Sequence, residues 1–304
     1  MGGKLQALID RAAQYPPLTM AVVDAGERHV MEGVGQALER GLIKPVFIGI
    51  RQRIEATAAA AKVPLDDHPI VEVISEQDAA RQGTQLAASG KVAGLMKGWL
   101  HTDVLMHPVL ARLRTERRIS HVFIVELASY HKLLFVTDAA INIQPDLMQK
   151  CAIVQNAVDL ARLLGIQRPK VAALSAVEVV KPEIVSTVDA ACLSKMAQRH
   201  QIHDALVDGP LAFDNAISRE AARIKQIDSD VAGDVDILLA PDLNAGNILA
   251  KDLEYLAGGV MAGVVLGAKV PIVLPSRSDP PVARLASMAV ASIMYHQQAE
   301  ISDA

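Results

Sequence analysis

The sequence predicts an α/β protein with a largely parallel sheet. Short β-branched runs alternate with longer, Ala-rich amphipathic segments along the chain. Many of the short runs are apolar at consecutive positions, which is typical of strands that are buried on both faces. Strands and helices alternating at this spacing favour right-handed crossovers between parallel strands.

The expected elements are short strands separated by helices. The strands cover residues 20–24, 45–50, 70–74, 92–96, 121–127, 170–174, 204–207, 236–240 and 270–274. A helix is expected over residues 27–40, where Gly41 takes the position that ends many helices. Ser75, with Asp78 three residues later, predicts the N-cap of another helix that runs to residue 90.

Length and composition narrow the functional class. A chain of 304 residues favours two domains of roughly 150 residues each. The hydrophobic fraction is 51% but the aromatic fraction only 3%, which predicts an aliphatic core and excludes a disordered chain. A net charge of -4 provides no electrostatic footprint for nucleic acid. Cys151 and Cys192 are too few for a disulfide framework and indicate a reducing compartment.

No segment has the pattern of a membrane span or a secretory leader. The longest uncharged stretch, residues 255–268, is shorter than the roughly 18 to 20 apolar residues of a spanning helix. The N-terminal segment has no apolar h-region, and Asp10 interrupts it early. We therefore expect a cytoplasmic protein that binds neither membrane nor nucleic acid.

The common nucleotide and nucleophile motifs are missing or incomplete. Residues 33–35 begin like a dinucleotide fingerprint, but Leu38 takes the place of the third glycine. Neither a P-loop nor a Gly-x-Ser-x-Gly elbow is present. Two His pairs have no acidic or Cys residue at ligand spacing, so we expect no metal site: His101 with His107, and His200 with His203.

Four polar segments follow expected strands, which is where open α/β sheets bind ligands. Residues 275–281 place Ser276, Arg277 and Asp279 ahead of a helix expected near Pro280, an arrangement that suits an anion. The other three segments are residues 135–142 with Thr137 and Asp138, residues 207–216 with Asp208 and Asp214, and residues 240–251 with Asn244, Asn247 and Lys251. Each alone also fits ordinary turn or cap chemistry. Together they favour one shared cleft.

These segments, in this order and spacing, resemble the phosphate acetyltransferase/phosphate butyryltransferase (phosphotransacylase) family along essentially the whole chain. The similarity is to the butyryltransferase-like branch. The matching segments are residues 97–98 with 101–103, 132–140, 207–212, 232–238, 241–247 and 276–279.

The resemblance implies a two-domain, three-layer α/β/α sandwich like that of the isocitrate and isopropylmalate dehydrogenases. The second domain is inserted into the first. Transferred to this chain, the first domain holds residues 1–128 plus 265–304, and the inserted one holds residues 129–264. The family resemblance places the active site in the cleft between them and implies a homodimer.

The implied reaction converts a short-chain acyl-CoA, acetyl-CoA or butyryl-CoA, and phosphate into acyl phosphate and CoA by direct attack in a ternary complex. Coenzyme A is a substrate, no cofactor is held permanently, and no metal takes part. An acyl kinase is the implied partner enzyme. By similarity Arg277 binds phosphate and stabilises charge on the carbonyl oxygen, and Ser276 donates a hydrogen bond to the sulfur or that oxygen.

The remaining site residues follow from the same resemblance. A carboxylate is expected to take the thiol proton. The acetyltransferase branch has an Asp a few residues beyond its Ser-Arg pair, where this chain has Ala283, and Asp279 is the nearest substitute. The expected substrate contacts are Thr137, Asp138, Asp208, Asp214, Asn244 and Asn247, and the residues expected to face CoA phosphates are Lys97, Arg114 and Lys251.

Two other functions stay open from the residues. An NAD-dependent hydroxy-acid dehydrogenase of the same fold would need a cluster of metal-binding aspartates and an Arg-rich substrate motif. A regulatory protein that binds acyl-CoA or acyl phosphate without turnover would keep the cleft and lose the chemistry.

Overall fold

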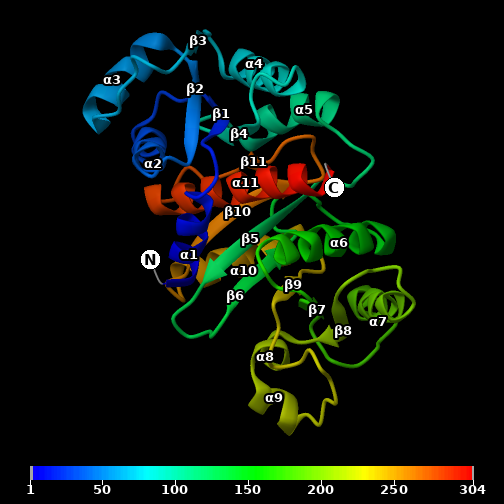
Figure 1. The fold of residues 1–304 in the computed structure, drawn as a ribbon. Helices are drawn as coiled ribbons and strands as arrows, with labels where there is room; N and C mark the ends of the chain where they lie inside the picture. The colour runs from blue at the N-terminus through cyan, green and yellow to red at the C-terminus, as the bar shows by residue number, and fades with distance from the viewer. Residues whose placement is uncertain (1–2, 303–304) are drawn as a thin grey trace. The chain divides into compact units, whose positions relative to one another are not determined.

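The computed structural model describes residues 3–302 and has the α/β class that the sequence predicts. The chain forms two compact units. The first runs to Arg117 and resumes at Val260, and the second comprises Arg118–Gly259. Each unit combines a sheet with helices that pack on it (Figure 1).

The unit boundaries differ from the expected domain boundaries at both crossings. Strand β5 (Ser120–Glu126), expected in the first domain, pairs antiparallel with β6 (Leu133–Thr137) and lies in the second unit. Strand β10 (Val260–Leu266) pairs antiparallel with β11 (Ile272–Val273) and lies in the first. The unit that each crossing segment joins follows from its long-range contacts, which are not visible in local sequence.

The first unit has a mostly parallel sheet with the strand order β3-β2-β1-β4-β11-β10. Neighbouring strands from β3 to β11 are parallel, and only β10 runs antiparallel to its neighbour β11. The remaining strands of this sheet are β1 (Leu18–Val23), β2 (Ile43–Gly49), β3 (Ile70–Glu72) and β4 (Gly94–Lys97).

The helices of the first unit form two groups. Helix α11 packs against α1, α2 and β10, whereas α4 packs against α5 and β1. Figure 1 shows α2 and α11 to one side of β1 and β4, and α4 and α5 to the other. The helices are α1 (Gly3–Ala12), α2 (Arg28–Glu39), α3 (Arg51–Ala61), α4 (Glu76–Ala88), α5 (Thr102–Arg112) and α11 (Pro281–Ser302).

Local signals set several of these helix ends. The Ser75 hydroxyl accepts a hydrogen bond from the Asp78 backbone N–H at 3.1 Å, which confirms the predicted N-cap of α4. The Glu27 carboxylate caps α2 through the Val30 N–H at 3.0 Å. Gly41 follows α2 with φ of 66°, the left-handed conformation that glycine adopts at low cost.

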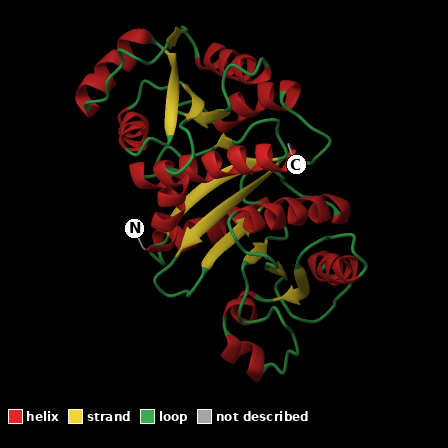
Figure 2. Ribbon diagram, viewed as in Figure 1, coloured by secondary structure: helices red, strands yellow, loops and turns green. Residues whose placement is uncertain are grey.

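The second unit has the strand order β5-β6-β9-β7-β8, in which only β5 is antiparallel to its neighbour. Helix α6 packs on β5, β6 and β9, and α10 also contacts β5 and β6 (Figure 2). The further strands are β7 (Lys170–Leu174), β8 (Leu206–Leu211) and β9 (Ile237–Leu239). The helices are α6 (Leu147–Leu163), α7 (Val185–Gln198), α8 (Phe213–Ile217), α9 (Arg219–Ile224) and α10 (Leu243–Tyr255).

Three local predictions were wrong. Residues 133–137, expected to lie partly in a loop, form β6, and β10 was not expected as a strand. The polar segment expected to follow a strand at residues 207–216 begins inside β8, which continues to Leu211. Short apolar runs do not distinguish a buried strand from other buried segments, so the pairing partner decides their conformation.

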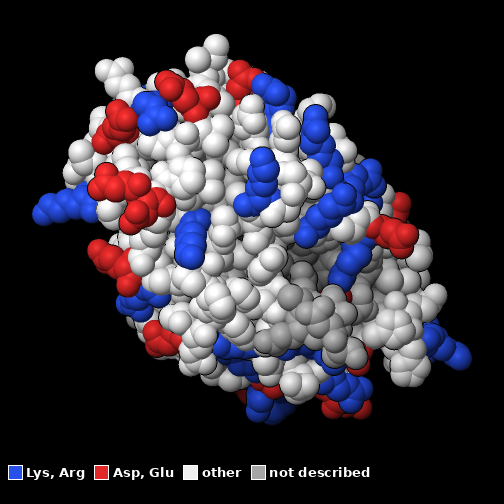
Figure 3. All heavy atoms as spheres, turned by 45° about the horizontal axis from the view of Figure 1, so that its top comes forward, with Lys and Arg blue, Asp and Glu red and all other residues white. Residues whose placement is uncertain are grey.

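The core is aliphatic, as the composition predicts. Ala, Val, Leu, Ile and Met supply most of the buried side chains, and Phe47 and Phe135 are the largest fully buried aromatic ones. Within the described residues no helix has the length and apolar character to cross a bilayer. Acidic and basic side chains are interspersed on the face shown in Figure 3.

Candidate active site

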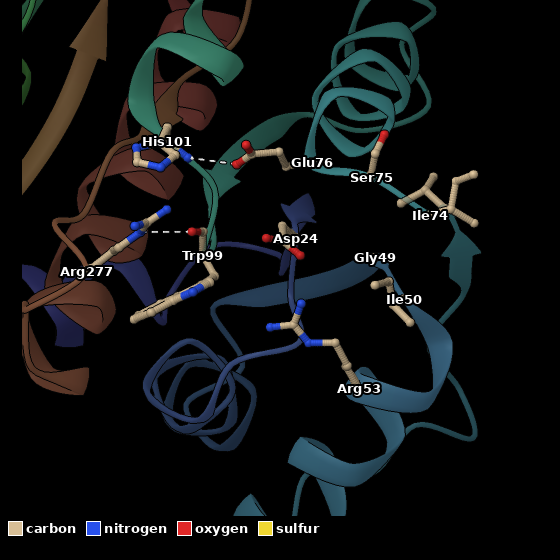
Figure 4. A pocket seen from close by; sticks show the side chains of 11 residues that line it. Asp24, Gly49, Ile50, Arg53, Ile74, Ser75, Glu76, Trp99, His101 and Arg277 are labelled. Atoms are coloured by element: carbon tan, nitrogen blue, oxygen red, sulfur yellow. Dashed lines mark hydrogen bonds between the residues drawn. The ribbon is translucent and has the colours of Figure 1, made fainter.

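A cavity of about 330 Å³ opens in the first unit where its parallel strands end. It lies past the carboxyl ends of β1, β2, β3, β4 and β11, where the chain order of the strands reverses beside β1. Ligands bind at such reversal points in open α/β sheets. The cavity is lined by Asp24, Gly49, Ile50, Arg53, Val73, Ile74, Ser75, Glu76, Trp99, His101 and Arg277 (Figure 4).

Arg277 is held in the cavity wall by Trp99. Its Nε donates a hydrogen bond to the Trp99 carbonyl oxygen at 3.0 Å, and its guanidinium carbon lies 5.0 Å from the centre of the Trp99 ring. The ring contact is a cation–π interaction that fixes the plane of the guanidinium. Neither Nη atom of Arg277 has a hydrogen-bond partner among the described residues, so both can bind an anion.

Asp24 and Glu76 are the carboxylates of the cavity. Asp24 directly follows β1, and Figure 4 shows its side chain among those of Arg53, Glu76 and Trp99. Burial raises the pKa of Asp24 above its usual value, an effect that Arg53 opposes and Glu76 reinforces. Glu76 begins α4 and accepts a hydrogen bond from the His101 backbone N–H at 3.3 Å.

Two further cations lie behind the cavity wall. Lys97 ends β4, is 3% exposed, and donates from Nζ to the Leu100 carbonyl oxygen at 3.2 Å. Burial lowers the pKa of Lys97 to about 8, and the charges of Arg284 and Arg277 act in the same direction. Arg284, in the first turn of α11, is fully buried. Basic side chains therefore gather at this end of the sheet together with the carboxylates of Asp24, Glu76 and Asp279.

The three predicted catalytic residues lie in one turn after β11. The Asp279 carboxylate accepts a hydrogen bond from the Ser276 backbone N–H at 2.8 Å, and the Asp279 N–H donates to the Ser276 carbonyl oxygen at 3.2 Å. The Ser276 hydroxyl lies 3.0 Å from that of Ser278. Arg277 lines the cavity, whereas Ser276 and Asp279 do not. The Asp279 carboxylate thus braces the turn that presents Arg277.

Thr137 and Asp138 end β6 and are buried. The Thr137 hydroxyl donates to the His121 carbonyl oxygen at 2.8 Å. The Asp138 carboxylate accepts hydrogen bonds from the backbone N–H groups of His121, Ala140 and Ile141 and from the Asn142 amide. These bonds occupy the carboxylate, so Asp138 organises its loop.

Asn247, Asn244 and Lys251 lie on α10 in the same unit. The Asn247 amide donates to the Ala139 carbonyl oxygen at 3.0 Å, which joins α10 to the loop after β6. Asn244 is exposed in the first turn of the helix. Lys251 is also exposed, with Nζ 5.7 Å from the Tyr255 ring centre. Asn244 and Lys251 are therefore accessible, and Asn247 is half-buried.

The remaining predicted residues are Asp208 and Asp214 in the second unit and Arg114 in the first. Asp208 is inside β8 and accepts a hydrogen bond from the Gly209 N–H at 2.8 Å. Asp214 is exposed in α8 and pairs with Lys225 at 3.2 Å. Arg114 is exposed after α5, where its backbone bridges to that of Ala268. Arg114 belongs to the unit that holds the cavity and does not line it.

Sequence reasoning missed Asp24, Arg53, Glu76 and Trp99 as site residues. Asp24 and Trp99 follow β1 and β4 directly, so the rule that ligands bind after strands applied to both. Polar residues follow both strands, with Glu27, Arg28 and His29 after Asp24 and His101 and Asp103 after Trp99, so this signal could have found the two segments. His101, considered only for metal binding, lines the cavity, and the described residues contain no cluster of three potential metal ligands.

The family model described as "Phosphate acetyl/butaryl transferase" matches residues 68–291. A phosphate acetyltransferase of Rickettsia felis is 48% identical over 97% of this chain and 86% of its own length. A phosphate butyryltransferase of Clostridium beijerinckii is 36% identical over 97% of this chain and 98% of its own.

Solved structures show the same similarity. A branched-chain phosphotransacylase from Enterococcus faecalis superposes with a TM-score of 0.79 at 31% identity, covering 92% of this chain and 99% of that one. A 4-hydroxythreonine-4-phosphate dehydrogenase from Klebsiella pneumoniae, at 14% identity, 91% and 99% coverage and a TM-score of 0.55, shares the fold alone. The chain belongs to the phosphate acetyl/butyryl transferase family and is a phosphate acyltransferase enzyme.

Proposed function

We propose that this enzyme converts a short-chain acyl-CoA and phosphate reversibly into acyl phosphate and CoA. Phosphate attacks the thioester carbonyl directly while both substrates are bound, with no acyl-enzyme. The observation that supports this most is Arg277, which Trp99 orients in the wall of a cavity with both Nη atoms available to an anion.

Charge on the reacting groups explains the need for such a residue. Phosphate is anionic, and negative charge also builds on the carbonyl oxygen as phosphate attacks. A guanidinium can bind two oxygens at once in fixed geometry and so can hold phosphate and stabilise that charge. Holding the two substrates together lowers the entropic part of the barrier. Ser276, next to Arg277, is proposed to donate to the sulfur or to the developing oxyanion.

Other predicted contacts differ in how accessible they are. Asn244, Lys251 and Arg114 are exposed, and we propose that they contact substrate, with Lys251 and Arg114 facing CoA phosphates. Asp208, Asp214 and Asn247 are the further proposed substrate contacts. Thr137, Asp138 and Lys97 have their polar atoms bonded within the protein, so we propose that they support neighbouring loops and charges.

The test mixes the purified protein with acetyl-CoA or butyryl-CoA, with and without phosphate, and follows the release of free thiol. We expect thiol release that requires phosphate and persists in the presence of a chelator. Thiol release at the same rate without phosphate would contradict the transferase proposal. Binding of acyl-CoA without turnover at any chain length would favour a regulatory protein, and hydroxy-acid oxidation with NAD would favour a dehydrogenase.

A panel of acyl-CoA thioesters from acetyl to isovaleryl measures the chain-length preference. Relatives of this chain are named for acetyl, butyryl and branched-chain substrates. One methylene changes discrimination by about 1–3 kcal/mol, so neighbouring chain lengths should differ by roughly 10- to 200-fold at a selective pocket.

We also propose a homodimer whose product is used by an acyl kinase. Acyl phosphates are mixed anhydrides that can transfer their phosphoryl group to a nucleoside diphosphate. Sedimentation of the purified chain tests the dimer, and a coupled assay with an acyl kinase and ADP tests whether the product is a competent phosphoryl donor.

A further inference from the structure

We propose that Asp24 is the catalytic residue that exchanges a proton with the thiol of CoA. The inference rests on the proposed function, because it assigns one step of that reaction to a side chain of the cavity.

The alternatives near the Ser276–Arg277 pair are poorly suited to this step. Position 283 is an alanine that is 3% exposed, so it offers no carboxylate. Asp279 accepts the Ser276 backbone N–H at 2.8 Å and is not part of the cavity wall. Protonating Asp279 would weaken a bond that holds the turn, so its carboxylate serves structure better than proton transfer.

Asp24 lies where the reacting groups would meet. Its backbone carbonyl oxygen accepts the Trp99 N–H at 3.0 Å, and the Trp99 carbonyl oxygen accepts Arg277 Nε at 3.0 Å. Asp24 and Arg277, from strands distant in sequence, are thereby held on two sides of one residue in the same cavity (Figure 4).

The carboxylate of Asp24 is available as a proton acceptor. It lines the cavity, is half-buried, and accepts no hydrogen bond from the described residues. The charged groups that act on it are Arg53 of α3, Glu76 of α4, Lys97 of β4 and Arg277 of the turn after β11. Burial raises its pKa, and Glu76 adds to this, whereas Arg53, Arg277 and Lys97 lower it. A raised pKa makes a carboxylate a stronger base.

The proton balance of the step is simple. In the direction of acyl-CoA synthesis, the S–H bond breaks and its proton moves to the Asp24 carboxylate. The sulfur forms a bond to the carbonyl carbon of acyl phosphate, and the carbon–oxygen bond to phosphate breaks with its electron pair leaving on phosphate. In the reverse direction the protonated Asp24 returns its proton to the departing thiolate.

Glu76 is the other carboxylate in the cavity wall and is a matched control. Its Oε2 accepts the His101 N–H, and it belongs to the first turn of α4, where the helix dipole stabilises an anion. Its carboxylate is thus already bonded to a backbone N–H, whereas that of Asp24 accepts no hydrogen bond from the described residues.

The experiment measures acyl phosphate consumption by CoA as a function of pH for the wild type, Asp24→Asn, Asp24→Gly, Glu76→Gln and Asp279→Asn. We expect Asp24→Asn to lower kcat by about 10²- to 10⁴-fold, the usual contribution of a general base. The acidic limb of the wild-type pH profile should disappear in this variant and persist in Glu76→Gln and Asp279→Asn. Because Asp24 has φ of 58°, glycine fits there without strain, and formate should partly rescue Asp24→Gly.

Each result is decisive. An unchanged kcat and pH profile in Asp24→Asn would overturn the proposal. So would a loss of activity in Asp24→Gly that formate does not rescue, even if Asp24→Asn fails to fold. If the wild type shows no phosphate-dependent turnover, the proposed function is wrong. The wild-type assay therefore distinguishes that failure from a failure of the Asp24 proposal.

Discussion

Nη2 of Arg284 donates a hydrogen bond to the carbonyl oxygen of Ser276 at 3.0 Å. Arg284 is fully buried, and its Nε and Nη1 have no hydrogen-bond partner among the described residues. Burial lowers the pKa of Arg284, although Asp279 and Glu27 oppose that effect. The N–H of Ser276 is bonded to Asp279, so both polar backbone atoms of the residue before Arg277 are held.

Replacing Arg284 by Met should lower activity, because Arg284 positions the turn that presents Arg277, while changing the stability of the fold only slightly. The variant removes the donor to Ser276 but also removes a buried charge with incomplete hydrogen bonding. We therefore expect the free energy of unfolding to change by less than about 2 kcal/mol, since these effects oppose each other. We expect kcat to fall by at least about tenfold because the turn that presents Arg277 loosens.

Urea unfolding and steady-state kinetics check both numbers for Arg284. Arg284→Lys is the matched control variant. It keeps a positive charge at this position but changes the geometry of the donor to the Ser276 carbonyl oxygen. Wild-type kcat in Arg284→Met would show that Asp279 alone holds the turn.

Arg277→Ala should reduce kcat by on the order of a hundredfold or more, because it removes the charge that stabilises the transition state. The rate of thiol release measures this effect. Arg223→Ala is a matched control, since Arg223 is exposed and pairs with Glu220 on α9. The prediction fails if both variants lose activity to the same small extent.

Gly98→Ala should disturb the site through the backbone. A Cβ at Gly98 would lie 2.1 Å from the Asp24 carbonyl oxygen and 2.5 Å from that of Val23. Backbone atoms of a central strand cannot move away cheaply, so we expect a destabilisation of about 1–3 kcal/mol or more together with a loss of activity. Differential scanning calorimetry checks the first effect.

Gly3→Ala is the control for Gly98→Ala because, among the described residues, its added Cβ would meet no heavy atom within 4 Å apart from its chain neighbours and its own helix backbone. It should keep the wild-type melting temperature to within a degree or two and keep the activity. If Gly98→Ala has the same melting temperature as Gly3→Ala, the backbone at Val23 and Asp24 can move away from residue 98 without cost, and the prediction is wrong.

Asp234 should make the second unit sensitive to acid. Its carboxylate lies 2.8 Å from Lys170 Nζ, 3.1 Å from Lys132 Nζ and 2.9 Å from His131 Nε2. Burial would raise the pKa of Asp234, but hydrogen bonds from Lys170 and Lys132 outweigh it and hold that pKa well below its usual range. The group therefore stabilises the fold above the unfolded-state pKa of 3.8, and the stabilisation is lost as pH falls below that value.

Asp234→Asn should lower the free energy of unfolding at pH 7 by about 1.5–3 kcal/mol and flatten its dependence on pH below about 4. Chemical denaturation at a series of pH values measures both effects. Glu220→Gln removes an exposed surface pair instead and should change stability by less than about 1 kcal/mol. If the free energy of unfolding of the wild type and of Asp234→Asn depends on pH in the same way below about pH 4, Asp234 does not cause the acid sensitivity.

The sequence was a good guide to elements whose cause is local. The cap at Ser75 and the helix end at Gly41 follow from short-range hydrogen bonding and backbone freedom, and the structure confirms both. It was a poor guide to β6 and β10, because an apolar run becomes a strand only when a neighbouring strand satisfies its backbone groups.

The predicted site residues also divide into those whose role follows from local sequence and those whose role depends on distant contacts. Arg277 was identified from its own loop and lies in the cavity wall. Asp138 was also predicted from its loop, but four hydrogen bonds occupy its carboxylate. Whether a polar side chain faces a cavity or braces a loop depends on donors that come from elsewhere in the chain.

By itself the sequence determined the α/β class, the aliphatic core and the set of polar loops that indicates the family. Only the tertiary structure decided which of those loops meet. Asp24, Trp99 and Arg277 follow three strands that are distant in sequence, and parallel pairing of β1 with β4 and of β4 with β11 brings them to one cavity. Strand order is set by burial and hydrogen bonding over the whole sheet, so no local pattern could have placed Asp24 beside Arg277.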